Sequence, residues 1–133
     1  MKLSELIKPV DGIAVAIVPE FEDSPSDWNV YIINLKSETI RNVLISTSGY
    51  GQIGEKSYKT STIRYFYDEI PPQSFAKIEP IVEEVFGLSN EYWVSFSLGK
   101  DMLDKRFIFL PETIQSDNFS TIPIMQKQGV MIK

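Results

Sequence analysis

The side chains that could carry chemistry in this sequence are carboxylates, hydroxyls and aromatic rings, because its 133 residues include neither histidine nor cysteine. Their absence excludes Ser–His and Cys–His catalysis, a thiolate nucleophile, zinc sites built on those residues, and disulfides. Acid–base catalysis would have to use paired carboxylates. We expect neither a metal nor a cofactor.

An acidic cluster is the first candidate for a site. Glu20, Glu22, Asp23 and Asp27 offer the hard oxygen ligands that Ca²⁺ prefers. Their spacing does not match an EF-hand, which needs a glycine at its turn and a terminal glutamate. We therefore interpret residues 20–27 as a solvated loop.

Two pairs of adjacent carboxylates, Asp68–Glu69 and Glu83–Glu84, could in principle act as acid and base. Neighbouring residues on a strand point to opposite faces, so the first pair would not cooperate at one site. The second pair falls on the polar side of a helix predicted over residues 81–88. The sequence thus predicts no catalytic residue and favours a binding protein over an enzyme.

Aromatic and basic residues are interleaved along residues 59–67, which follow a glycine-containing loop predicted at residues 49–54. Aromatic rings flanked by cations can stack on nucleic-acid bases or anchor a partner protein. The alternative is an ordinary strand whose aromatic side chains fill the core. Trp93 could likewise be buried in the core or exposed as part of a contact surface. The candidate binding residues are Tyr50, Tyr58, Lys59, Arg64, Tyr65, Tyr67 and Trp93.

The composition favours β-structure, so we expect strands to position these side chains. The chain has 17 isoleucines and 9 valines against 8 leucines and 3 alanines, and β-branched residues favour strands. Short apolar runs between turn residues are typical of a sandwich or barrel. We predict one all-β domain over residues 1–133, an immunoglobulin-like antiparallel β-sandwich of about seven to nine strands with at most one or two short helices. A small, partly open β-barrel is the alternative.

Alternation assigns one face of each predicted strand to the core. It places Trp28, Val30 and Ile32 together, and it separates Trp93 from Tyr92. Residues 90–98 and 105–110 should pair as a hairpin. The other predicted strands cover residues 13–18, 28–35, 43–47, 57–67 and 74–79, with one or two more between residues 121 and 133.

Alternation along the strand predicted at residues 74–79 places Phe75, Lys77 and Glu79 on one face, opposite Ala76 and Ile78.

Several stretches resemble a family of small bacterial proteins without an assigned activity. They are residues 27–34 (DWNVYIIN), 59–64 (KTSTIR), 75–79 (FAKIE), 90–94 (NEYWV), 104–109 (DKRFIF) and 129–133 (GVMIK). The resemblance covers nearly the whole chain, and some members carry the label phenylalanyl-tRNA synthetase subunit. That label implies ATP-dependent aminoacylation, but the motif arginines and ATP-binding strands of a much longer synthetase domain have no match here. The resemblance therefore supplies no catalytic residues.

Charge and hydropathy narrow the choice of partners and location. Thirteen basic against 18 acidic residues give a net charge of −5, which disfavours nucleic acid as a partner. Polar residues interrupt residues 3–9, so we expect no signal segment, no membrane partner and a cytoplasmic location. We expect a non-catalytic module that binds another protein or itself. Alternatives are a carbohydrate-binding or carboxylate-based hydrolase domain, and an accessory protein related to phenylalanyl-tRNA synthetase.

Overall fold

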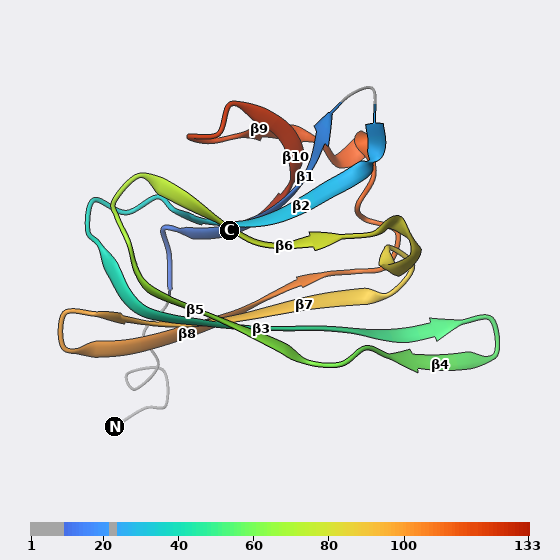
Figure 1. Cartoon of the computed structure of the whole chain (residues 1–133), viewed down its shortest axis with the longest axis horizontal. Coiled ribbons are helices and arrows are strands. Elements are labelled where there is room, and N and C mark those ends of the chain that lie inside the picture. The colour runs from blue at the N-terminus through green and yellow to red at the C-terminus, as the bar shows by residue number, and fades with distance from the viewer. Residues whose placement is uncertain (1–9, 22–23) are drawn as a thin grey trace, which may run out of the picture.

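The computed structural model describes residues 10–21 and 24–133, which form two antiparallel sheets packed face to face (Figure 1). Residues 3–9, where we expect no signal segment, and Glu22 and Asp23 of the acidic cluster lie outside the described residues. In the described part of the chain, no helix has the length and apolar character needed to cross a membrane. The ten strands of this part are β1 (Ile13–Phe21), β2 (Ser24–Asn34), β3 (Ile40–Ile53), β4 (Lys56–Lys59), β5 (Ile63–Ile70), β6 (Ser74–Ile81), β7 (Ser89–Leu98), β8 (Asp101–Phe109), β9 (Ser120–Ile122) and β10 (Lys127–Ile132), and its two 3₁₀ turns are η1 (Glu83–Val85) and η2 (Ser116–Asn118).

The first sheet has the strand order β6-β2-β1-β10-β9, with β1 at its centre. Alternate residues of β1 join the main core between the sheets. The intervening Ala14, Ala16 and Val18 belong to a smaller core on the outer face, against which Ile124 and Met125 of the β9–β10 turn pack. Both faces of the first sheet therefore pack against other parts of the chain, although Phe75 of β6 is 44% exposed on the outer face.

The second sheet is organised by β3, which is 14 residues long. It pairs with β7 on one side, and with β5 and then β4 on the other, while β8 pairs with β7 at the far edge. Figure 1 shows the β3–β4 hairpin extending past the first sheet. Gly54 forms its turn with φ of +66°, a backbone conformation that glycine adopts without steric cost.

The main core lies between the two sheets and is rich in aromatic side chains from the second sheet. Tyr92, Phe96, Phe107 and Phe109 of β7 and β8 are almost wholly buried. Burying a large apolar side chain contributes about 1.5–3 kcal/mol. Four such rings at the centre help to explain how a domain without disulfides holds together.

The predicted antiparallel β-sandwich is confirmed. The described residues form ten strands rather than seven to nine, mainly because the single strand predicted at residues 57–67 is divided into β4 and β5. The barrel alternative does not occur, because the strands are divided between two separate sheets.

The helix predicted over residues 81–88 is wrong. Strand β6 continues to Ile81, and only Glu83–Val85 forms a 3₁₀ turn. Val82 is exposed, whereas Phe86 and Leu88 return to the interior. The apolar residues have helix-like spacing because the end of β6 is followed directly by the 3₁₀ turn, after which Phe86 and Leu88 pack into the core.

The loop predicted at residues 49–54 and the single strand at residues 57–67 are also wrong. Strand β3 runs through to Ile53, and the chain that pairs with it is interrupted between β4 and β5. At the interruption the Thr60 amide donates to the Gly49 carbonyl at 2.8 Å, and Thr60 Oγ1 accepts from the Gly49 amide at 2.7 Å. Two short strands thereby pair with successive parts of one long strand.

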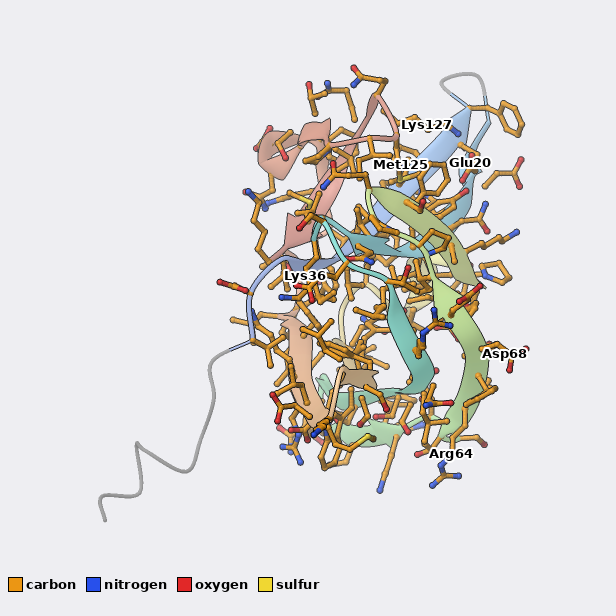
Figure 2. All side chains as sticks on the ribbon, turned by 90° about the vertical axis from the view of Figure 1, so that its left-hand side faces the viewer. Glu20, Lys36, Arg64, Asp68, Met125 and Lys127 are labelled. Carbon is orange, nitrogen blue, oxygen red and sulfur yellow. The ribbon has the colours of Figure 1, made fainter. Side chains whose placement is uncertain are left out.

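Most of the solvated loop predicted at residues 20–27 is wrong, because residues 20–21 belong to β1 and residues 24–27 belong to β2. Glu20 lies on β1, where it accepts hydrogen bonds from Asn29 Nδ2 at 3.0 Å and from the Tyr31 hydroxyl. Its Oε2 also pairs with Lys127 Nζ at 2.6 Å, and Figure 2 shows these two side chains together. Burial acts to raise the pKa of Glu20, but the hydrogen bonds from Lys127, Tyr31 and Asn29 outweigh it and lower the pKa below its ordinary value.

Candidate functional site

The outer face of the second sheet has an exposed large side chain on each of four strands, whereas Ile124 and Met125 pack over the centre of the first sheet's outer face. Among the described residues, Leu44, Phe66, Trp93 and Met102 project from β3, β5, β7 and β8 and are exposed to solvent. Exposed apolar groups that gather on one face often mark a contact surface. We call these four residues, with Arg64 and Arg106, the aromatic face.

Strand register shows that the aromatic face is continuous. Arg64 lies opposite Ser46, Ser46 opposite Trp93, and Trp93 opposite Arg106, so one row crosses all four strands. The next row runs from Phe66 through Leu44 and Ser95 to Asp104. Side chains that are directly opposite on adjacent strands share a face and touch.

Trp93 is held in one orientation at the centre of the aromatic face. Its Nε1 donates to Asp104 Oδ2 at 2.9 Å, and the Arg106 guanidinium carbon lies 4.2 Å from the ring centroid. A cation over an indole ring is attracted by the ring electrons. The side chain nevertheless remains 38% exposed, so a large and preorganised ring is available for contact.

The charges on this face are balanced, unlike those of the chain as a whole. Figure 2 shows Arg64 and Asp68 pointing away from the body on β5. Alternation and register place three basic and three acidic residues on this side of the sheet, whereas the whole chain has a net charge of −5. These six residues are Lys59, Arg64, Arg106, Asp68, Glu91 and Asp104.

The structure divides the predicted binding residues into two groups. Arg64 and Trp93 lie on the aromatic face. Tyr50 and Lys59 pair with each other in the β3–β4 hairpin and lie on the same side of the second sheet as the aromatic face. Tyr58 pairs with Gly51 and so points to the opposite side of the hairpin. The remaining two predicted residues, Tyr65 and Tyr67, face the first sheet.

Tyr65 and Tyr67 close one side of the sandwich. The Tyr65 hydroxyl donates to Glu79 Oε1 at 2.9 Å, and the Tyr67 hydroxyl donates to the Lys77 carbonyl at 2.6 Å. Burial, and then the hydrogen bond to Glu79, raise the pKa of Tyr65 to about 12. Burial, and then the negative charge of Glu79, also raise the pKa of Tyr67. Both tyrosines join the two sheets and are not free for a partner.

Glu79 is the centre of a polar cluster between the sheets. In addition to Tyr65, Thr47 Oγ1 donates to Oε1 at 3.2 Å and the Tyr92 hydroxyl donates to Oε2 at 3.0 Å. Burial, and then the charge of Glu79, raise the pKa of Tyr92. A carboxylate has about four acceptor positions, so these three donors use most of them. The cluster ties β6 to three strands of the second sheet.

The predicted placement of Glu79 and Ile78 on opposite faces is wrong, and a β-bulge is the reason. Val30 pairs with Glu79, whereas the next residue, Tyr31, pairs with Lys77, so one extra residue stands in β6. A bulge of this kind changes which side chains face the core. Both Ile78 and Glu79 consequently face inward, and a hollow of about 280 Å³ borders Glu79.

The sequence analysis missed four members of the aromatic face, namely Leu44, Phe66, Met102 and Arg106. Alternation alone could have found Phe66, which shares a strand face with Arg64. The other three required the strand register, which the sequence does not display.

Comparison with known proteins adds no family to this description. No protein-family model matches the chain, and no curated protein matches it either.

Proposed function

We propose that this chain is a non-catalytic binding module that associates with a second copy of itself through the aromatic face. The observation that carries the proposal is that Leu44, Phe66, Trp93 and Met102 are exposed on one face across four strands, with Trp93 held in place by Asp104 and Arg106. Aromatic residues and arginine dominate the binding energy of protein interfaces. A symmetric pair would bury the exposed rings of both copies.

Charge supports a second copy as the occupant. Two chains that each carry a net charge of −5 repel one another at long range. The aromatic face carries both cations and acids, so two copies can pair opposite charges across it in spite of this repulsion. A strongly basic or strongly acidic partner would gain less from such a balanced face.

Features of several sheet edges favour association by this face over association by strand pairing. Edge strand β6 carries a bulge and Pro80, and edge strand β9 has only three residues. Lys105 of edge strand β8 lies opposite the buried Val94 and therefore points to the core side, where its Nζ donates to the Val10 carbonyl at 3.4 Å. Prolines, bulges, short strands and inward-pointing charges are recognised ways of blocking edge pairing.

The alternative of a carbohydrate-binding module has less support. Such a site needs an open aromatic platform. Arg106 lies over the ring of Trp93, and Trp28 is almost wholly buried.

Sedimentation velocity over a wide concentration range tests the proposal. We expect the wild-type chain to form a dimer as its concentration rises, and Phe66→Ser to weaken dimerisation at least tenfold. Leu110→Ser is the matched control, because Leu110 lies off this face and has the same 59% exposure as Phe66. Urea unfolding of each variant checks that the fold is retained.

Two results would overturn the proposal. One is a wild-type chain that stays monomeric at every concentration. The other is an equal loss of association in Phe66→Ser and Leu110→Ser, which would mean that association is unspecific.

A further inference from the structure

A second surface feature, separate from the aromatic face, lies at one end of the sandwich. A hollow of about 620 Å³ opens between the end of β1, the start of β2, η1 and the segment that follows β8. This volume is within the range of small-molecule sites, about 300–1,000 Å³. Six of its lining residues carry the inference: Phe21, Trp28, Phe86, Phe119, Glu83 and Glu112.

Aromatic rings form the walls of this hollow. Trp28 packs edge-to-face against Phe86, with ring centroids 5.1 Å apart, and against Phe119 at 6.0 Å. The contacts fix the three rings relative to one another. Phe21, at the end of β1, is 61% exposed at the rim of the hollow. The hollow therefore has walls in which the rings of Trp28, Phe86 and Phe119 are fixed by mutual packing, and an exposed ring, Phe21, at its rim.

Two carboxylates stand among these rings. Trp28 Nε1 donates to Glu83 Oε1 at 3.2 Å, which holds that carboxylate beside the indole. Glu112 has a positive φ of +64°, and its amide donates to the Phe86 carbonyl at 3.0 Å, which fixes this residue to the wall. A left-handed backbone is costly for a residue other than glycine and recurs at functional positions.

The charge of the hollow is of one sign. Among the described residues that line it, Glu83 and Glu112 are acidic and none is a lysine or arginine. A cation bound there would be attracted by two carboxylates and by the negative face of an exposed ring such as Phe21, whereas an anion would be repelled by both carboxylates. This is the chemistry that recognises organic cations.

We propose that this hollow binds an organic cation with an apolar surface, of the quaternary-ammonium class. Such a cation carries its charge on methyl groups, which can contact aromatic rings without the loss of hydrogen bonds that a hydrated ammonium suffers. The cation can be a free small molecule or a trimethylated lysine side chain of a peptide. Both present the same trimethylammonium group.

Titration calorimetry with choline and with 3,3-dimethylbutan-1-ol tests the role of charge. The two probes have the same shape, but the alcohol has a neutral carbon in place of the charged nitrogen. We expect choline to bind at least tenfold more tightly, since cation–π and carboxylate contacts together contribute about that factor. A third probe, a short peptide with trimethyllysine, identifies the source: tighter binding than choline indicates a protein ligand, and weaker binding indicates a free one.

Matched variants locate the binding. Glu83→Gln combined with Glu112→Gln should weaken choline binding at least tenfold. Glu84→Gln should not, because Glu84 is the neighbour of Glu83 but does not line the hollow. Trp28 fluorescence in a Trp93→Phe background should change on addition of choline, because Trp28 is then the single tryptophan.

The proposal is overturned if choline does not bind, if the neutral alcohol binds equally well, or if Glu84→Gln weakens binding as much as the double variant. Urea unfolding of each variant confirms that any loss of binding is not a loss of fold. These outcomes are independent of the dimer, because the named residues of the hollow and of the aromatic face do not overlap.

Discussion

Removing Glu79 should destabilise the protein substantially, because three hydroxyl groups from the second sheet donate to its carboxylate. In Glu79→Ala the hydroxyls of Tyr92 and Thr47 lose their acceptor within residues that are only 1% and 4% exposed. A buried donor without a partner costs about 1–3 kcal/mol. Tyr65 is half-buried and can turn to water, so its loss is smaller.

The expected net loss is about 3 kcal/mol in the free energy of unfolding. Two unpaired buried hydroxyls cost about 2–6 kcal/mol together. Two effects reduce this figure: the variant no longer desolvates a carboxylate, and water can enter the neighbouring hollow of about 280 Å³. A domain of this size has about 5–15 kcal/mol of stability, so the variant should remain folded and measurable.

A double-mutant cycle with Tyr92→Phe tests the cause. Urea unfolding followed by circular dichroism gives the free energies of both single variants and of the double variant. Because a hydrogen bond to a charged group contributes about 1.5–3 kcal/mol, we expect a coupling energy of that size between Glu79 and Tyr92.

Tyr67→Phe is the control for this cycle, because the Tyr67 hydroxyl donates to the Lys77 carbonyl and not to Glu79. Its coupling to Glu79 should stay below about 0.5 kcal/mol, which is the usual limit for independent positions. If Tyr92 and Glu79 prove additive within that limit, or if Tyr67 couples as strongly as Tyr92, the cluster does not act as a hydrogen-bonded unit and the reasoning fails.

Two further predictions concern backbone packing and pH. Gly129→Ala should lower the free energy of unfolding by about 1–3 kcal/mol in urea, because the new Cβ would lie 2.6 Å from the Ile17 carbonyl oxygen. Gly99→Ala should lower it by only about 1 kcal/mol, because the new Cβ meets no atom within 4 Å and the only penalty is the positive φ of +61°. The free energy of unfolding should fall as pH rises from about 10 to about 12. The reason is that the pKa values of Tyr31 and Tyr65 are raised to about 12 in the folded chain, so the unfolded chain releases these protons at lower pH. A urea midpoint that stays constant across this pH window would contradict the raised values.

Alternation along single strands was the most reliable guide to the fold. It placed Trp28, Val30 and Ile32 on one strand face, which the structure shows to be the face in the main core, and it separated Tyr92, which is buried, from Trp93, which is exposed. The period of two holds wherever a strand is regular.

Prediction failed where an extra residue or a tight turn interrupted the period. The bulge in β6 turned both Ile78 and Glu79 inward, although simple alternation placed them on opposite faces. At residues 81–88, a strand end and a 3₁₀ turn together produced the apolar spacing of a helix. Both errors come from local backbone geometry that residue types do not reveal.

The candidate sites were harder to predict than the fold, because they depend on contacts between segments that are distant in sequence. Arg64 and Trp93 were identified, but Leu44 and Arg106 join them only through the register of β3, β7 and β8. The hollow likewise brings Trp28 beside Glu83, 55 positions away. Single-sequence patterns carry no information on such pairings.

The outer faces of the two sheets differ, and this difference explains why we expect self-association through the second sheet. On the first sheet, Ile124 and Met125 of the chain's own β9–β10 turn pack against the apolar cluster that includes Ala14 and Ala16. On the second sheet, Phe66 and Met102 remain exposed within the described residues. Exposed apolar area is costly in water unless a partner covers it. The fold covers the centre of the first sheet's outer face with its own chain and leaves Phe75 exposed at the β6 edge of that face. The outer face of the second sheet leaves large side chains exposed on all four of its strands that form the aromatic face, which association can cover.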